Sequence, residues 1–259
     1  MKNKEYILSC GDALEFVKKL EPSSIDLVLT SPPYNMGKKY DVYNDITLWD
    51  NYVDNLVYMC AYLFKACKPN SRLIINLANY VRFRPITFEV IYKIYSKTKW
   101  HFQEEIIWYK GDGYNVDSSD RYGDVFANQP QTIIDAHSPL VALVHEGIYV
   151  FTHIHRDEVL SAKPLDKPVA LRSVINFSTN KDKSIQHPCP SPLPLAEFLI
   201  QSFSSKGDTV LDPFCGSGTF GVAAVRHNRS FIGYDLSQNY LDICKKRIEK
   251  EIKNVDKTT

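Results

Sequence analysis

The sequence predicts an α/β fold organised around a doubly wound, mostly parallel sheet. Short apolar runs rich in β-branched residues alternate with longer segments whose apolar residues recur at helical spacing, which is typical of β-α-β units. The 259 residues are enough for one such domain with an insertion, and 44% of them are apolar. Because the chain has neither a long uncharged apolar run nor a signal peptide, we expect no membrane span and a cytoplasmic location.

The first 110 residues contain the clearest alternation. Strands are expected at Tyr6–Cys10, Ile25–Thr30, Leu73–Leu77 and Glu104–Tyr109, and helices near Leu14–Leu20, Trp49–Phe64 and Ile86–Tyr95. The helix that starts at Trp49 is expected to end near Lys68-Pro69-Asn70, since proline does not continue a helix.

The alternation fails between residues 110 and 186 and resumes at His187. Strand-like pieces at Leu140–Val144, Gly147–Phe151 and Val174–Phe177 are separated there by long polar stretches. Structureless stretches of this length in a compact domain are usually functional or partly disordered. Beyond His187 the pattern predicts strands at Thr209–Leu211 and Ser230–Tyr234, and helices at Pro194–Ser204, Thr219–His227 and from Gln238 onward.

Ser31-Pro32-Pro33-Tyr34 follows directly on the buried strand Ile25–Thr30. The two prolines stiffen the segment and remove two backbone donors, so carbonyl acceptors stay free. Ser31 adds a hydroxyl acceptor and Tyr34 a flat ring. These groups suit a planar molecule that carries an exocyclic amine, and the alternative is a plain Pro-Pro turn that leaves the strand.

A glycine-rich turn forms the second motif, Asp212-Pro-Phe-Cys-Gly216-Ser-Gly218-Thr-Phe-Gly221, which follows a strand and opens a helix. Glycines at such a turn let the backbone approach a ligand, as in nicotinamide, flavin and S-adenosylmethionine sites. A carboxylate at Asp212 suits a ligand with an ammonium group and repels a pyrophosphate. Read together, the two motifs indicate a methyl donor beside an amine acceptor.

The net charge and the spacing of cysteine and histidine bear on two other kinds of site, a surface for polyanions and a metal site. The net charge is +1, so any polyanion site must be built from local basic clusters. The six cysteines form no Cys-x-x-Cys pair, which indicates reduced thiols, and His153-x-His155 has no accompanying ligand spacing. We therefore expect no metal site.

Both motifs resemble those of the exocyclic-amino DNA methyltransferases of bacterial restriction–modification systems. The catalytic motif comes first and the glycine motif last, an order similar to the β group of that family. Further matching segments are Gly11-Asp12, Ile106–Lys110, His187–Leu195 and Arg229–Asp235. The resemblance covers roughly residues 5–110 and 187–250.

The resemblance implies the Rossmann-like fold of S-adenosylmethionine-dependent methyltransferases, with residues 1–110 and 187–259 as the catalytic core. Residues 111–186 would hold the target-recognition region together with some core strands. The implied catalytic residues are Ser31, Pro32, Pro33 and Tyr34. The implied cofactor residues are Asp12, Ala13, Ser31, Asp212, Phe214, Gly216, Gly218, Thr219 and Asp235. Asp12 would meet the cofactor adenine and Asp235 its ribose, and the alternative for each is a helix cap.

The implied reaction is direct methyl transfer to the exocyclic N4 of a cytosine flipped out of double-stranded DNA. Within this family serine at the position of Ser31 goes mostly with cytosine N4, while aspartate or asparagine goes mostly with adenine N6, which remains the alternative. The resemblance also implies a bacterial or archaeal host and a separate cognate restriction endonuclease, and allows a homodimer. Asn35 and Lys38 are expected near the pocket, and His187 is expected to cap the proline segment.

Candidate phosphate contacts are the basic residues near the pocket and in the irregular region: Lys38, Arg121, Lys163, Lys167, Arg172, Lys181 and Lys183. The alternative for such residues is a solvated surface. Other functions that remain open are a catalytically silent DNA-binding subunit, an NAD-dependent oxidoreductase, and a methyltransferase that acts on RNA or on protein glutamine.

Overall fold

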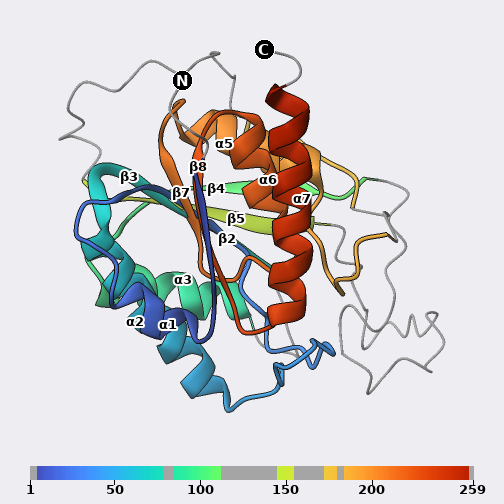
Figure 1. Cartoon of the computed structure of the whole chain (residues 1–259). Coiled ribbons are helices and arrows are strands. Elements are labelled where there is room, and N and C mark those ends of the chain that lie inside the picture. The colour runs from blue at the N-terminus through green and yellow to red at the C-terminus, as the bar shows by residue number, and fades with distance from the viewer. Residues whose placement is uncertain (1–4, 79–84, 112–144, 155–171, 180–183, 257–259) are drawn as a thin grey trace.

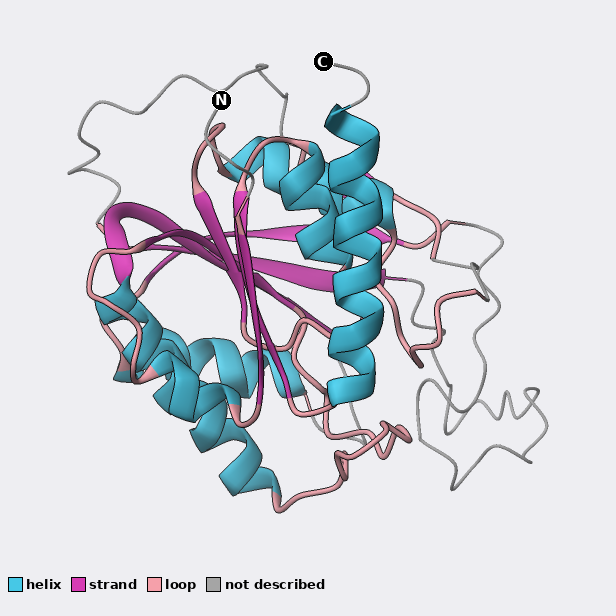
Figure 2. Cartoon of the chain, viewed as in Figure 1, coloured by secondary structure: helices cyan, strands magenta, loops and turns pink. Residues whose placement is uncertain are grey.

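An eight-stranded sheet crosses the molecule and carries helices on both faces (Figures 1 and 2). This computed structural model describes residues 5–78, 85–111, 145–154, 172–179 and 184–256. The strand order is β1-β8-β7-β2-β3-β5-β4-β6. The strands are β1 (Tyr6–Cys10), β2 (Ile25–Thr30), β3 (Cys67–Leu77), β4 (His101–Tyr109), β5 (His145–Thr152), β6 (Val174–Asn176), β7 (Thr209–Asp212) and β8 (Ser230–Asp235).

Two groups of helices enclose the sheet, as expected for a doubly wound fold. One face is covered by α1 (Ala13–Val17), α2 (Trp49–Ala66) and α3 (Ile86–Lys97). The other face is covered by α5 (Leu193–Phe203), α6 (Thr219–Arg226) and α7 (Gln238–Asp256). None of the helices in the described part of the chain is long and apolar enough to cross a membrane.

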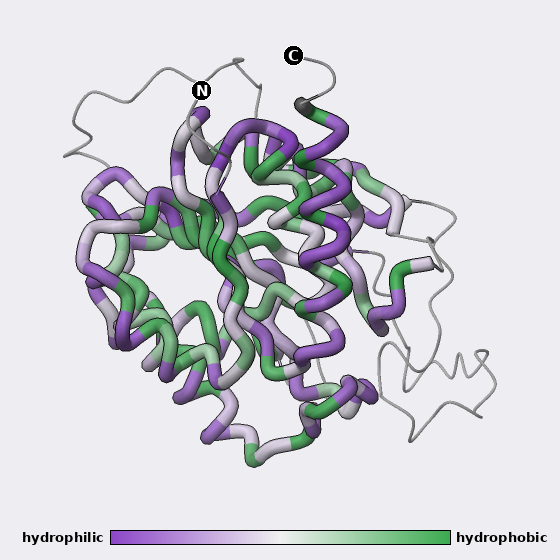
Figure 3. The backbone as a smooth tube through the Cα atoms, in the orientation of Figure 1, coloured by the Kyte–Doolittle hydropathy of each residue, from purple (hydrophilic) through white to green (hydrophobic). Residues whose placement is uncertain are grey.

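The central strands are apolar on both faces because each face packs against helices. In β2, Val28 joins the core beneath α1–α3, while Leu27 and Leu29 join the core beneath α5–α7. All three side chains have no exposed surface. Figure 3 shows the same contrast, with hydrophobic central strands and a mixed hydropathy along α7. Strands buried on both faces read as continuous apolar runs, which is why β2 was visible in the sequence.

One strand runs against the others. Five of the seven strand pairings are parallel, and β5 is antiparallel to both β3 and β4. The sequence predicted a mostly parallel sheet but did not predict that β5 separates β3 from β4. Because β5 and β6 belong to residues 111–186, this stretch contributes strands to the core sheet. The strand-like piece Leu140–Val144 lies outside the described residues.

The helix from Trp49 ends at Ala66, close to the expected stop near Lys68-Pro69-Asn70, but β3 starts at Cys67, six residues before the expected strand start at Leu73. Ile25 pairs with Cys67 and Leu27 with Arg72, so the register between β2 and β3 shifts across this stretch. A bulge of this kind accommodates a proline, which has no N–H for the ladder. The proline thus follows the end of the helix as expected, and it lies in the irregular first part of β3. The first helix, α1, is also shorter than expected, since it ends at Val17.

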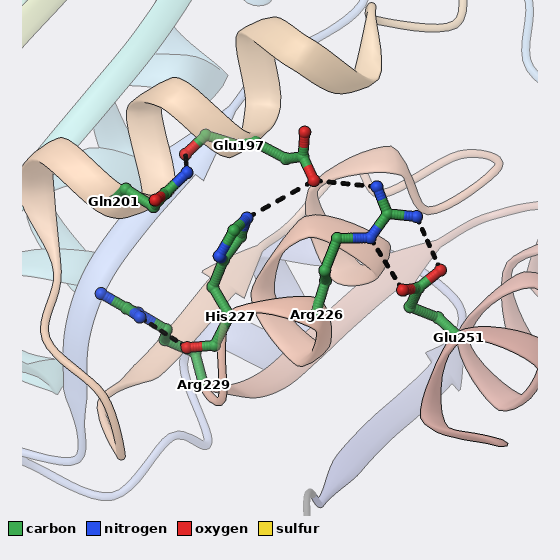
Figure 4. Close-up of polar contacts among 6 residues, drawn as sticks. All are labelled: Glu197, Gln201, Arg226, His227, Arg229 and Glu251. Atoms are coloured by element: carbon green, nitrogen blue, oxygen red, sulfur yellow. Dashed lines mark hydrogen bonds and ion pairs between the residues drawn. The ribbon is translucent and has the colours of Figure 1, made fainter. Parts of the chain in front are cut away.

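An ion-pair network joins the three helices on the second face (Figure 4). Arg226 of α6 donates from Nε and Nη2 to the two carboxylate oxygens of Glu251, at 2.7 Å each. Its Nη1 donates to Glu197 of α5 at 2.8 Å. Bidentate pairing fixes the planar guanidinium, so the three helices are held at one relative position.

Candidate active site

The two sequence motifs meet in one cavity of about 810 Å³ at the carboxyl edge of the sheet. β2 and β7 are neighbours, yet the helices after them, α2 and α6, lie on opposite faces. Such a switch point leaves a crevice in which α/β proteins bind ligands. The cavity volume is in the range of small-molecule sites, about 300–1,000 Å³.

Most of the predicted site residues line this cavity. The lining includes Asp12, Ala13, Ser31, Pro32, Pro33, Tyr34, Lys38, Asp212, Phe214, Gly216, Thr219 and Asp235. Gly218 does not line it and instead begins α6 in the left-handed conformation. The structure therefore brings both motifs together from positions about 180 residues apart in the chain.

The hydroxyl group of Tyr34 has two hydrogen-bond partners, Ser31 and Glu146. Its Oη lies 3.0 Å from Ser31 Oγ and donates to Glu146 Oε2 at 3.2 Å. Burial, with a smaller contribution from the Glu146 carboxylate, raises the pKa of Tyr34 well above its ordinary value. The phenol therefore keeps its proton and remains a donor.

Glu146 is a site residue that sequence reasoning missed. It lies in β5 and lines the cavity, where Lys110 Nζ pairs with its Oε1 at 2.7 Å. Asn76 Nδ2 at the end of β3 donates to its Oε2 at 3.0 Å. The only signal in the sequence is a carboxylate at the start of an apolar run, which is too common to indicate a site.

The segment after Tyr34 is folded onto the carboxylate of Asp45. Its two oxygens accept the backbone N–H groups of Asn35 at 2.8 Å, Met36 at 2.9 Å and Lys38 at 3.1 Å. Asn35 has a φ of +58° and is 2% exposed, and its side chain exchanges hydrogen bonds with the backbone of Thr47. Asn35 thus shapes the loop, and Lys38 reaches the cavity.

Asp212 is a buried carboxyl group at the end of β7. Its Oδ1 accepts hydrogen bonds from Thr30 Oγ1 at 2.7 Å and from the N–H of Phe214 at 3.0 Å. Burial raises the pKa of Asp212 to about 7, and the two hydrogen bonds oppose this rise. A cation in the cavity would favour the charged form and bind against it.

The glycine turn leaves no room for side chains. Gly216 and Gly218 have φ values of +49° and +79°. A Cβ on Gly216 would lie 2.7 Å from His187 Nε2, and one on Gly218 would overlap Cys244 Sγ. Arg247 of α7 supports the turn from outside the cavity, where its Nη1 donates to the carbonyl of Ser217. Sequence reasoning did not single out Arg247, which reads there as part of a charged helix.

Asp12 and Asp235 cap backbone groups and also line the cavity. Oδ1 of Asp12 accepts from the N–H groups of Leu14 and Glu15 at the start of α1. Asp235 accepts from the N–H of Gly216 at 2.9 Å and of Ser237 at 2.8 Å. The capping alternative is therefore observed for Asp12, whereas α7 is capped by Ser237 Oγ, which accepts the N–H of Tyr240 at 3.1 Å. Asp12 and Asp235 both line the cavity, where each carboxylate can contact a ligand.

His187 lies behind the glycine turn. Its Nδ1 accepts the N–H of Cys189 at 3.3 Å, in agreement with the expected cap of the proline segment. Burial lowers the pKa of His187 to about 4, so the ring is neutral at physiological pH. Its neighbours Tyr40 and Tyr240 enclose it on two sides.

Asp41 connects the segment after Tyr34 to the start of α7. Its Oδ2 accepts from Ser237 Oγ at 2.7 Å and from Asn239 Nδ2 at 2.8 Å at the start of α7. This contact spans 196 residues of sequence, and Ser237 itself lines the cavity.

The predicted DNA contacts are only partly within the described structure. Lys38 lines the cavity, while Arg172 is exposed just before β6 and does not line it. The predicted phosphate contacts that lie outside the described residues are Arg121, Lys163, Lys167, Lys181 and Lys183. Among the residues that are described, no group of His, Cys, Asp or Glu could hold a metal ion.

A family model described as DNA methylase, which is named for the N6 and N4 amino-methyltransferases, matches residues 25–246. The chain belongs to this family. Members of the family take the methyl group from S-adenosylmethionine, and solved structures with the same fold include complexes with this cofactor. The protein is thus a DNA amino-methyltransferase, and the NAD-dependent alternative is removed.

Individual relatives cover nearly the whole chain. The Type II methyltransferase M.HpaI of Haemophilus parainfluenzae is 27% identical over 96% of this chain and 76% of its own length. The DNA adenine methyltransferase YhdJ of Escherichia coli K12 is 26% identical over 92% of this chain and 81% of its own length. The structure of the cytosine-N4-specific PvuII DNA methyltransferase matches with a TM-score of 0.70 at 20% identity, covering 97% of this chain and 91% of that chain. The last match shows the fold alone.

Proposed function

We propose that the protein methylates the exocyclic N4 of a cytosine flipped out of duplex DNA. The observation that carries the proposal is Ser31, a short hydroxyl at the first position of the catalytic segment. A carboxylate or amide at this position has a longer reach and a different polarity, which suits the larger ring system of adenine. Adenine N6 remains the second candidate, because YhdJ, one of the relatives, is an adenine methyltransferase.

The geometry supports a direct transfer without a covalent intermediate. An exocyclic amine is a weak nucleophile because its lone pair is delocalised into the ring. Acceptors from Ser31 Oγ and the carbonyl of Pro32 would hold its two hydrogens and favour a more tetrahedral nitrogen. Tyr34 would stack on the ring and fix it against the donor methyl, so that proximity and orientation supply most of the acceleration.

The cofactor would lie on the other side of the same cavity. Its ammonium group would meet the buried carboxyl of Asp212, its ribose Asp235 and its adenine Asp12 and Phe214. Ala13 and Thr219 would complete the contacts. Thr30 joins the two proposed subsites through its hydrogen bond to Asp212, so a methyl donor held by these residues would lie beside the segment Ser31–Tyr34.

We extend the proposal to the biological setting. Residues 111–186 would carry target recognition beyond the strands that they give to the sheet. The M.HpaI relative is a Type II methyltransferase, so this protein would protect DNA in the cytoplasm of a bacterial or archaeal cell from a separate cognate endonuclease. A homodimer is also compatible with this role.

Nucleoside analysis tests the base assignment. The protein is incubated with labelled S-adenosylmethionine and duplex DNA from a host that lacks the enzyme, and the DNA is digested and separated by chromatography. We expect label in N4-methylcytosine, and the Ser31→Ala variant is expected to lose activity while it still binds cofactor. Label in N6-methyladenine alone would contradict the assignment, and methylation-aware sequencing of the same DNA would give the recognition sequence.

A further inference from the structure

Behind the catalytic segment, hydrogen bonds link three polar side chains in a row, from Ser31 through Tyr34 to Glu146. Ser31 Oγ lies 3.0 Å from Tyr34 Oη, and Tyr34 Oη lies 3.2 Å from Glu146 Oε2. These three side chains all line the cavity, but they come from two distant parts of the chain. Glu146 belongs to β5, the antiparallel strand that sequence reasoning did not place beside β3.

The position of Glu146 is fixed by two further contacts. Lys110 Nζ pairs with its Oε1 at 2.7 Å, with both side chains nearly buried at 10% and 13% exposure. Asn76 Nδ2 donates to its Oε2 at 3.0 Å. The ammonium group and the amide hold the carboxylate of Glu146 in one orientation.

Hydrogen-bond chemistry then fixes which group donates and which accepts in each of these two hydrogen bonds. A carboxylate only accepts, so Tyr34 must give its single hydroxyl hydrogen to Glu146. Because that hydrogen is already donated, Tyr34 Oη can only accept a hydrogen bond from Ser31, whose hydroxyl is then the donor. The hydrogen of Ser31 is thus turned away from the substrate, and the remaining lone pairs of Oγ are left as acceptors.

We propose that Glu146 is a positioning residue that acts through Tyr34 to make Ser31 an acceptor for the target amine. This inference rests on the proposed role of Ser31. An acceptor at Ser31 makes the site prefer bases with an exocyclic amine, such as cytosine or adenine. A base that has a carbonyl in the position of the amine, such as uracil, is disfavoured. A carbonyl would face the lone pairs of Ser31 without a hydrogen between them.

The Glu146→Gln variant tests whether Glu146 fixes Ser31 as an acceptor, because a glutamine amide can donate to Tyr34 Oη. Tyr34 can then donate to Ser31, whose hydrogen turns toward the pocket. We expect kcat to fall about 10- to 100-fold, the loss of one well-placed charged hydrogen bond, with the cofactor Kd within about twofold of wild type. Glu105→Gln is the matched control, since Glu105 accepts from Tyr149 Oη at 2.9 Å outside the cavity lining. It is expected to keep kcat within about twofold.

A double-mutant cycle with Tyr34→Phe separates this role from a merely structural one. Because Phe removes the hydroxyl that carries the effect, Glu146→Gln in the Tyr34→Phe background is expected to add less than about twofold to the loss. Fully additive losses would overturn the proposal. If Glu146→Gln does not fold, Glu146→Asp, whose shorter side chain withdraws the carboxylate from Tyr34 Oη, takes its place in the cycle with Tyr34→Phe, with the same non-additivity expected.

Substrate preference gives a second readout. The target base is placed opposite an abasic site, so that cytosine and uracil are both unpaired and differ only in the pocket. Wild type should bind the duplex with cytosine more tightly than the duplex with uracil, and Glu146→Gln should reduce this difference. Equal preference in both proteins would overturn the inference. If wild type produces only N6-methyladenine, the cytosine assignment fails while the cycle, measured on adenine, still decides the role of Glu146.

Discussion

Thr30 Oγ1 donates to Asp212 Oδ1 at 2.7 Å, which joins the end of β2 to the end of β7. Thr30 immediately precedes the segment proposed to hold the target base, and Asp212 opens the turn proposed to hold the cofactor. Both side chains are buried, at 1% and 2% exposure. The hydrogen bond therefore couples the position of one subsite to the ionisation of the other, in a part of the fold where the dielectric constant is low.

Cofactor affinity should increase with pH up to about pH 7. Burial raises the pKa of Asp212 to about 7 in the free protein, so below that value the carboxyl is mostly protonated. The cofactor ammonium favours the charged form, and binding must then release a proton, which weakens affinity by up to about tenfold per pH unit below pH 7. Calorimetry in two buffers of different ionisation enthalpy measures the proton. The Asp212→Asn variant should bind weakly and independently of pH in this range.

Thr30→Val should move this pH dependence upward. The Thr30 hydrogen bond lowers the pKa of Asp212, so its loss leaves the carboxyl protonated to higher pH. At pH 6 the variant should bind cofactor about tenfold more weakly than wild type, with a smaller difference at pH 8.5. An unchanged pH profile in Thr30→Val would show that this contact does not control the ionisation of Asp212.

The parts of the site that the sequence predicted depend on local chemistry. Two motifs were predicted from the sequence, Ser31-Pro32-Pro33-Tyr34 and the glycine turn. The conformation of each is determined by its own residues, namely prolines, left-handed glycines and a carboxylate at the end of a strand. Glu146 was missed for the opposite reason. Its role depends on β5 inserting between β3 and β4, and the choice of a strand's neighbours is made by contacts far apart in sequence. The early start of β3 at Cys67 was missed for the same reason, since it depends on the pairing of Ile25 with Cys67.

Gly218→Ala should destabilise the protein far more than Gly207→Ala. Both glycines have φ near +80°, so both substitutions carry the strain of that conformation, about 1 kcal/mol. A Cβ on Gly218 would also overlap Cys244, while a Cβ on Gly207 would have no atom within 4 Å. We expect a loss of about 2–4 kcal/mol for Gly218→Ala and about 1 kcal/mol for Gly207→Ala. Denaturant unfolding measures both, and equal losses would contradict the steric argument.

Arg226→Ala should lower the Tm by roughly 3–6 °C, since the network in Figure 4 is partly exposed and contributes about 1–2 kcal/mol. The matched control is Lys18→Ala, which removes an exposed Lys18–Glu15 pair within one helical region and should leave the Tm unchanged. Scanning calorimetry at low and high salt checks both variants. A similar Tm for Arg226→Ala and wild type would show that the packing of α5, α6 and α7 does not depend on these ion pairs.

The basic residues on either side of β6 should contribute to DNA binding through phosphate contacts. Replacing Arg172, Lys181 and Lys183 with alanine is expected to weaken binding and to reduce the slope of log K against log salt by up to about 3, because each lost contact releases about 0.9 fewer counterions. A charge-matched control replaces Lys245, Lys250 and Lys253, which are exposed on α7. Fluorescence anisotropy over a range of salt concentrations measures both slopes. If the first variant keeps the wild-type slope, or the α7 variant loses as much, the phosphate-binding surface lies elsewhere on the molecule.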